Sequence, residues 1–174
     1  MPLLPWFLLL WAPLQGRVHV VDQAGGPGSD FTSIGAAVSA ALSGDVVLVR
    51  EGRFGRDDFF DFIVNGKSLT VVAELGASVV TPDVAVVNLP LGGSVLVQGL
   101  TFEVQGLTGV LLDSQGELWL ERCRFHPLLF VNDFEGPRIS NCASVVMTRC
   151  EVDAPLMVHG IRATRSNVHL YQSV

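Results

Sequence analysis

Residues 30–54 read DFTSIGAAVSAALSGDVVLVREGRF, and this stretch joins a helix-like segment to a strand-like one without a linker. In its first half, Ile34, Val38 and Leu42 recur at the spacing of one helical face. The second half contains VVLV from Val46, a short apolar run that is typical of a buried strand. The fold must therefore place one short helix directly at the start of a region of strands.

The segment from residue 30 to residue 43 has the end signals of a short helix. Thr32 or Ser33 can accept hydrogen bonds from the free N–H groups of the first turn. Gly44 follows the last apolar position and tolerates the left-handed geometry that ends many helices. We predict a capping helix over residues 30–43 that ends at Gly44 and lays its apolar face against the first strands.

A diverged repeat runs through the rest of the chain. Apolar strand segments begin at intervals of 23 to 27 residues, and the later copies alternate apolar and polar residues. Alternation with a period of two predicts strands that bury one face. Side chains at constant offsets after each strand start should stack in columns. The strand starts are Val46, Leu69, Val95, Leu118, Val145 and Val168, and the expected columns are Leu100, Cys123, Cys150 and Ser173, then Phe102, Phe125 and Val152.

The intervals between these copies contain further short strand candidates and turn residues, but no helical pattern. Parallel strands normally need helical crossovers, and a solenoid of stacked turns is the economical way to return without them. We therefore predict an all-β fold, a right-handed parallel β-helix solenoid with an N-terminal capping α-helix. Residues 17–174 form this single domain, with five or six rungs from about residue 44.

The last repeat ends within a rung, at SNVHLYQSV. A solenoid needs its terminal rung covered by a cap or a neighbour. We expect that the sequence is truncated at its C-terminus or that a partner stacks on the open rung.

Part of the chain resembles a known superfamily. The region from Val20 to Val80, with DFTSIGAAV, GDVVLVREGRF and NGKSLTVVAELGASVV, is similar to the N-terminal cap and first coils of pectin-lyase-like β-helix proteins, which include pectin methylesterases. This similarity extends over most of the chain after about residue 18. The resemblance implies the fold. It does not supply the methylesterase motifs, because the nearest match, from Asp61 to Ile63, lies before the first full rung.

Composition and charge narrow the classes of function. Of the 174 residues, 49% are hydrophobic, which suits buried strands in one domain. The 11 basic and 17 acidic residues give a net charge of -6 with no basic stripe, which argues against a nucleic acid partner. The same charge disfavours a strongly anionic polymer as ligand, because like charges slow encounter.

The N-terminus carries an apolar run from Pro2 to Leu14. This run is too short to span a membrane and fits the apolar region of a secretory signal. Residues 1–16 are therefore a possible signal peptide, and we predict a secreted or cell-surface protein. The sequence has no basic residue before the run, and a buried segment is the alternative.

Three cysteines, Cys123, Cys142 and Cys150, occur without a CxxC spacing. This pattern indicates neither a zinc site nor a disulfide framework, and it allows at most one bridge within the chain. Small buried hydrophobic side chains are the preferred interpretation.

The resemblance also implies what an enzyme site would need. Polysaccharide lyases of this superfamily bind Ca²⁺ through clustered carboxylates and use an Arg or Lys as base, so Asp113, Asp133 and Arg138 are the catalytic candidates. Asp113 also fits a turn, and Asp133 lies on the longest insertion between rungs. The remaining candidates are Glu135, Asp153 and Arg162. Because no spacing places these residues in one column, we predict no cofactor and no metal site, and Ca²⁺ enters only under the lyase alternative.

Trp119 and His169 share the second, outward-facing position of their strands. An exposed indole is an apolar platform on which a sugar ring can stack. We take both residues as candidate ligand-binding residues. The alternative is that Trp119 packs beneath a loop.

These patterns favour a non-catalytic, secreted or surface β-helix module that associates with carbohydrate, since no catalytic set is complete. The first alternative is the N-terminal part of a polysaccharide-active enzyme, a lyase or a carbohydrate esterase. The second is a structural solenoid that serves as a spacer. A polysaccharide is the expected partner, without nucleic acid and without a membrane span.

Overall fold

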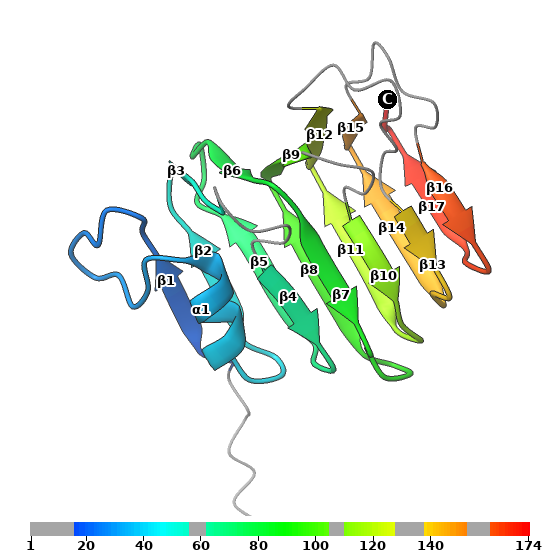
Figure 1. Cartoon of the computed structure of the whole chain (residues 1–174), viewed down its shortest axis with the longest axis horizontal. Coiled ribbons are helices and arrows are strands. Elements are labelled where there is room, and N and C mark those ends of the chain that lie inside the picture. Colours follow the sequence, from blue (N-terminus) through cyan, green and yellow to red (C-terminus); the bar gives the residue numbers. More distant parts are fainter. Residues whose placement is uncertain (1–15, 56–61, 105–109, 128–137, 153–160) are drawn as a thin grey trace, which may run out of the picture.

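The chain forms a parallel β-solenoid of about five turns with one short helix near its N-terminus (Figure 1). The structure is a computed structural model, and it describes residues 16–55, 62–104, 110–127, 138–152 and 161–174. No helix in the described part of the chain could traverse a bilayer. The predicted all-β solenoid with an N-terminal helix is thus confirmed.

Three parallel sheets form the walls of the solenoid, and each turn contributes one strand to each sheet. Sheet A consists of β1 (Val18–Val21), β2 (Val46–Val49), β5 (Leu69–Ala73), β8 (Ser94–Gln98), β11 (Glu117–Glu121), β14 (Ser144–Thr148) and β17 (Val168–Tyr171). Sheet B consists of β3 (Gly52–Arg53), β6 (Val79–Thr81), β9 (Leu100–Val104), β12 (Arg124–Pro127) and β15 (Glu151–Val152). Sheet C consists of β4 (Phe62–Asn65), β7 (Val84–Val87), β10 (Val110–Asp113), β13 (Arg138–Ser140) and β16 (Arg162–Thr164).

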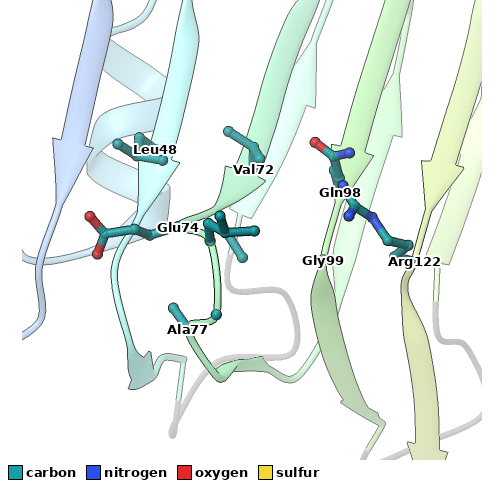
Figure 2. A pocket seen from close by; sticks show the side chains of 10 residues that line it. Leu48, Val72, Glu74, Ala77, Gln98, Gly99 and Arg122 are labelled. Carbon is teal, nitrogen blue, oxygen red and sulfur yellow. The ribbon is translucent and has the colours of Figure 1, made fainter.

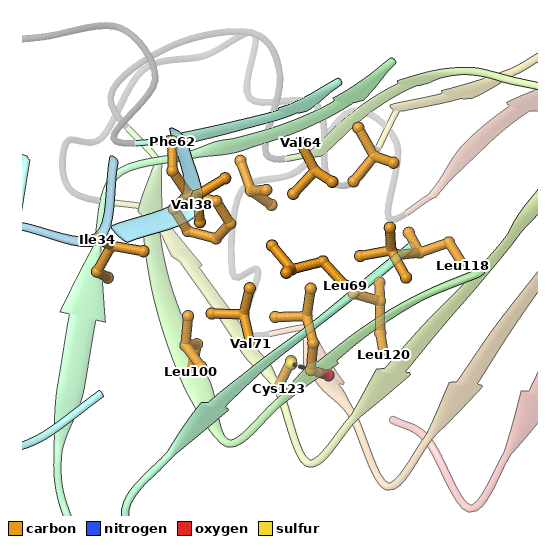
Figure 3. Packing of buried hydrophobic residues seen from close by; sticks show 14 of the residues in the cluster. Ile34, Val38, Phe62, Val64, Leu69, Val71, Leu100, Leu118, Leu120 and Cys123 are labelled. Atoms are coloured by element: carbon orange, nitrogen blue, oxygen red, sulfur yellow. Dashed lines mark hydrogen bonds between the residues drawn. The ribbon is translucent and has the colours of Figure 1, made fainter. Parts of the chain in front are cut away.

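The core consists of columns of inward side chains that stack from turn to turn (Figure 3). The predicted aromatic column is confirmed, because Phe125 pairs in register with Phe102 on one side and Val152 on the other. The rings of Phe102 and Phe125 lie nearly parallel with centroids 5.1 Å apart. In-register stacking of like side chains gives every rung a similar core and makes the repeat self-consistent.

The register of the first repeat differs from the prediction by one residue. Val46 pairs with Thr70, and Leu69 pairs with Val95. Val47 and Val49 therefore point inward and are fully buried. The run VVLV is apolar at every position, so its pattern does not reveal which residues face the core, and a shift of one residue exchanges the two faces.

Helix α1 (Ile34–Ala40) closes the N-terminal end, where it packs against β1, β2 and β4. Ser33 is the N-cap, and its hydroxyl accepts a hydrogen bond from the Ala36 N–H at 3.2 Å. Ile34 and Val38 are fully buried, as the apolar face predicted.

The end of the helix differs from the prediction. The chain leaves the helix at Ala41, so Leu42 is 73% exposed and Gly44 lies beyond the helix, in the turn before β2. The ammonium group of Lys67 donates to the carbonyl oxygens of Val38 and Ala41 at 2.6 and 2.7 Å. A cation from the next turn therefore caps the helix, in place of a glycine.

The corner that follows each strand of sheet A has left-handed backbone geometry. Gly99, Arg122, Arg149 and Gln172 occupy equivalent positions with φ of 76°, 52°, 53° and 50°. The N–H groups of Gly99, Arg122 and Arg149 each donate to a carbonyl of the following turn, as Arg122 does to Thr148 at 2.9 Å. These hydrogen bonds between turns hold these residues in a backbone conformation that L-residues otherwise avoid.

The last described rung is more exposed than the others. Leu170, at an inward position of β17, is 52% exposed, and Val174 is 92% exposed. Within the described residues, no strand packs beyond β17. The predicted stacking partner stays a prediction.

Candidate ligand-binding face

The outer face of sheet A presents two columns of side chains. We call it the sheet A face and define it by these columns. The first column is Val18, Val46, Thr70, Leu96, Trp119, Val146 and His169. The second is Val20, Leu48, Val72, Gln98, Glu121, Thr148 and Tyr171.

The two halves of the sheet A face differ in chemistry. From β1 to β5 its side chains are aliphatic except for Thr70. From β8 onward the first column holds Leu96, Trp119, Val146 and His169, and the second column holds amide, carboxylate and hydroxyl groups and ends in Tyr171. The second half combines flat apolar surfaces with hydrogen-bonding groups, which is the combination that carbohydrate recognition requires.

Trp119 stands on β11 between Leu96 and Val146 and is 44% exposed. Its indole Nε1 donates to the Glu117 carboxylate at 3.4 Å. This bond ties the polar edge of the ring to a residue two positions earlier on β11, and it leaves apolar ring surface open to solvent. Within the described residues, this exposure disfavours the alternative that Trp119 packs beneath a loop.

Tyr171 is a second exposed aromatic residue on the same face. It lies two strands from Trp119, in the other column, and is 55% exposed. His169, two residues earlier on β17, occupies the column of Trp119 and is also exposed. The sequence analysis selected Trp119 and His169 but missed Tyr171, although the same alternation places it outward.

A groove of about 380 Å³ runs along the edge of the sheet A face (Figure 2). Leu48, Val72 and Ala73 line it with apolar surface. The turn from Glu74 to Ala77, closed by a hydrogen bond between the Ala77 N–H and the Glu74 carbonyl at 2.9 Å, borders it on one side. The groove therefore continues the sheet A face around the corner toward sheet B.

The opposite side of the groove carries Gln98 and Arg122 (Figure 2). The side chains of Gln98 and Glu74 make no hydrogen bond within the described part of the chain. Arg122 Nε lies 3.6 Å from the Glu121 carboxylate, so its charge is already partly neutralised. The polar groups that stay available favour a ligand with many hydroxyl groups and no charge.

Sheet B differs in this respect, because its outer charges pair with one another. Arg53 pairs with Glu103, and Arg124 donates to Glu151 at 2.6 Å. These ion pairs satisfy their own polar groups. On the sheet A face, the side chains of Gln98 and Thr148 have no such partner among the described residues.

Two of the predicted lyase residues, Asp113 and Arg138, belong to sheet C. Arg138 is exposed on β13, and the register of sheet C places the backbone of Asp113 opposite Ser140. Asp133, Glu135 and Asp153 lie outside the described residues. Among the described residues, no group of three acidic, histidine or cysteine side chains could hold a metal ion. The catalytic assignments therefore stay predictions, and of these residues Asp113 and Arg138 lie on a different sheet from Trp119.

Two buried carboxylates that the sequence analysis did not single out lie at corners of the solenoid. Asp45 accepts hydrogen bonds from the Leu42 N–H, His19 Nε2 and the Arg17 N–H at 2.8, 2.9 and 2.8 Å, and these donors lower its pKa to about 2. Burial raises the pKa of Asp83 to about 8. Both residues serve the corners and do not face the groove, whose lining includes neither.

No protein-family model matches this chain, and the searches of curated proteins and of solved structures gave no match either. The likeness to pectin-lyase-like proteins therefore depends on the residues quoted above and on the solenoid itself.

Proposed function

We propose that this chain is a non-catalytic binding module that holds a neutral polysaccharide across the sheet A face. The observation that carries the proposal is the placement of Trp119 and Tyr171, two half-exposed aromatic side chains on one flat parallel sheet. Two sugar rings of one extended chain can stack on these side chains. The stacking would bury apolar ring faces that water now covers.

The polar side chains around the aromatic pair support this ligand class. In the second column, Glu121 shares β11 with Trp119, and Thr148 lies on β14 between the two aromatic strands. Gln98 follows at the groove. Carboxylate, hydroxyl and amide groups bind sugar hydroxyls as acceptors or donors. Glu117 and Glu121 would repel a polyanion, which together with the net charge of -6 favours a neutral chain.

Two features beyond the face agree with a carbohydrate-associated role. The resemblance to pectin-lyase-like β-helix proteins supports membership of a superfamily that acts on polysaccharides. The apolar run from Pro2 to Leu14 supports export as a signal peptide, which would place the protein where such polymers occur. We include both in the proposal.

Isothermal titration calorimetry tests the proposal with soluble xyloglucan, glucomannan and mixed-linkage β-glucan, and with polygalacturonate as the anionic comparison. We expect binding to at least one neutral polymer and weaker or no binding to polygalacturonate. Trp119→Ala should weaken this binding by about tenfold, which corresponds to about 1.4 kcal/mol. Tyr171→Ala should weaken the binding less, because Tyr171 lies on the last strand of sheet A and would contact only one end of the bound polysaccharide.

Leu91→Ala is the matched control, since Leu91 is 82% exposed and lies at the corner before β8, outside the two columns of the sheet A face. Its affinity should equal that of the unaltered protein. Absence of binding to all three neutral polymers would overturn the proposal and favour the structural solenoid. If Trp119→Ala and Tyr171→Ala both bound as tightly as the unaltered protein, the ligand would have to bind to another wall of the solenoid.

A further variant asks whether the polysaccharide enters the groove. Gln98→Ala removes the amide that borders the groove but leaves both aromatic side chains in place. A loss of affinity by a few-fold would indicate that the bound chain continues from Trp119 toward Leu48. Unchanged affinity would confine the ligand to the strands from β11 to β17.

A further inference from the structure

Cys123 and Cys150 occupy one inward column at the corner between sheets A and B. Their neighbours fix the register, because Arg124 pairs with Glu151 and the Glu151 N–H donates to the Cys123 carbonyl at 2.9 Å. Both cysteines are reduced and nearly inaccessible, with 1% and 2% of their surfaces exposed. Figure 3 shows Cys123 among the apolar side chains of the core. The two thiols are thus direct neighbours in consecutive turns.

The spacing between consecutive turns suits a disulfide. Neighbouring strands lie about 4.8 Å apart, and bridged cysteines have Cα atoms about 4.4–6.8 Å apart. Because the two Cβ atoms point in the same direction, they start slightly farther apart than the usual 3.5–4.5 Å of a disulfide. A relative shift of the two turns by a few tenths of an ångström is sufficient to close the bridge.

The Cys150 sulfur lies toward the turn that carries Cys123, while the Cys123 thiol donates to the Val97 carbonyl at 3.5 Å in the turn before its own. The Cys150 thiol donates to the Leu120 carbonyl at 3.3 Å, in the preceding turn, to which Cys123 belongs. The neighbouring Cys123 thiol lowers the pKa of Cys150, while burial raises the pKa of Cys123. Cys150 is therefore the better nucleophile of the two.

The third cysteine cannot compete for either partner. Cys142 lies before β14, and Cys150 follows it, so the five residues of that strand separate them. At about 3.3 Å per residue, the gap exceeds about 15 Å, far beyond the reach of a disulfide. Of the three possible pairs, only Cys123 with Cys150 is adjacent.

We propose that Cys123 and Cys150 are a thiol pair that closes into an intrachain disulfide between two consecutive turns when a small disulfide acts as oxidant. When a local opening of the last turn exposes Cys150, its thiolate attacks one sulfur of the oxidant, which gives a mixed disulfide and releases one small thiol. The Cys123 thiolate then attacks the Cys150 sulfur and displaces the second small thiol. Two electrons pass from the cysteines to the oxidant, and the two thiol protons end on the released thiols, directly or through solvent.

Peptide mapping of the folded chain tests the pairing. The chain is equilibrated with mixtures of oxidised and reduced glutathione, alkylated, digested and analysed by mass spectrometry. We expect one bridged peptide pair, Cys123 with Cys150, and alkylated Cys142. A bridge that includes Cys142, or three alkylated cysteines in a folded chain at high oxidised glutathione, would overturn the proposal.

Thermal unfolding provides a second readout. The oxidised chain should unfold about 5–10 °C above the reduced chain, because the bridge restricts the unfolded state. Cys123→Leu and Cys150→Ser should abolish this difference, and Cys142→Ser should preserve it. The first two variants copy Leu100 and Ser173, which occupy the same column in the neighbouring turns, so the fold accepts both side chains there. A redox-dependent shift that persists in Cys150→Ser would also contradict the proposal.

Discussion

At the corner before β2, the Asp45 carboxylate accepts hydrogen bonds from Leu42, His19 and Arg17, and its pKa is about 2. At the corner between β6 and β7, Oδ1 of Asp83 has no hydrogen-bond partner in the described part of the chain, and its pKa is about 8. Both residues are less than one-tenth exposed. The comparison teaches that hydrogen-bond donors, more than burial, decide whether a corner of this solenoid can hold a charge.

Ile34→Asp would place a carboxylate without partners in the apolar core under the capping helix. Ile34 is fully buried beneath the capping helix, so the new charge would lie among apolar side chains. We expect a loss of about 3–5 kcal/mol in the free energy of unfolding, measured by urea denaturation monitored with circular dichroism. Ile34→Val is the control and should lose about 1 kcal/mol. An Asp variant as stable as the Val variant would show that the cap does not exclude water.

Asp83→Asn should stabilise the chain at high pH. Because the folded pKa of Asp83 lies above its unfolded value, the folded chain binds more protons between about pH 4 and pH 8, and its stability falls as pH rises through this range. The amide variant lacks this fall and should exceed the unaltered protein by a few kcal/mol at pH 8, since each pKa unit is worth about 1.4 kcal/mol.

The measurement for Asp83→Asn is the free energy of unfolding at several pH values. The two stabilities should converge below about pH 3, where the carboxyl group is protonated in both states. Parallel curves for the two proteins would contradict the raised pKa.

Asp45→Asn makes the same substitution at the other corner, and we expect the opposite sign. The amide nitrogen cannot accept, so at least one of the three donors loses its partner. The melting temperature at pH 7 should fall by about 5 °C. Because the folded pKa lies below the unfolded value, Asp45 stabilises the fold above about pH 4, and this contribution is lost as pH falls toward 2. Calorimetry at pH 7 and pH 3 checks both parts, and a variant with unchanged melting temperature would remove the contrast between the corners.

Lys67→Met has the smallest expected effect of these variants, and it removes a hydrogen-bond donor where the preceding variants change an acceptor. The ammonium group donates to Val38 and Ala41 at the end of α1, where carbonyl groups lack helical partners. The variant should lose about 1 kcal/mol, measured by urea denaturation at low salt. Lys67→Arg keeps the charge and should retain most of this stability. Equal losses in both variants would indicate that shape, and not charge, matters at this position.

The candidate site could be predicted in part from alternation along the strands. Trp119 and His169 share an outward column because residues two apart lie on one face of a strand. Tyr171 follows the same rule and could have been found by it. The groove could not, because it combines β2, β5 and β8 with the turn from Glu74 to Ala77, which only the stacking of turns brings together.

The amino-acid pattern was sufficient to predict the solenoid, the capping helix and most of the inward columns, because a repeat with a period of two in its strands leaves few other ways to bury its apolar residues. The register of Val46, the capping of α1 by Lys67 and the opposite states of Asp45 and Asp83 became clear only in the folded chain. The register and the Lys67 cap depend on atoms that the neighbouring turn supplies, and so do the His19 and Arg17 donors to Asp45, whereas Oδ1 of Asp83 lacks a donor among the described residues. Apart from the local Leu42 donor to Asp45, these contacts join residues distant in the chain, which local patterns do not reveal.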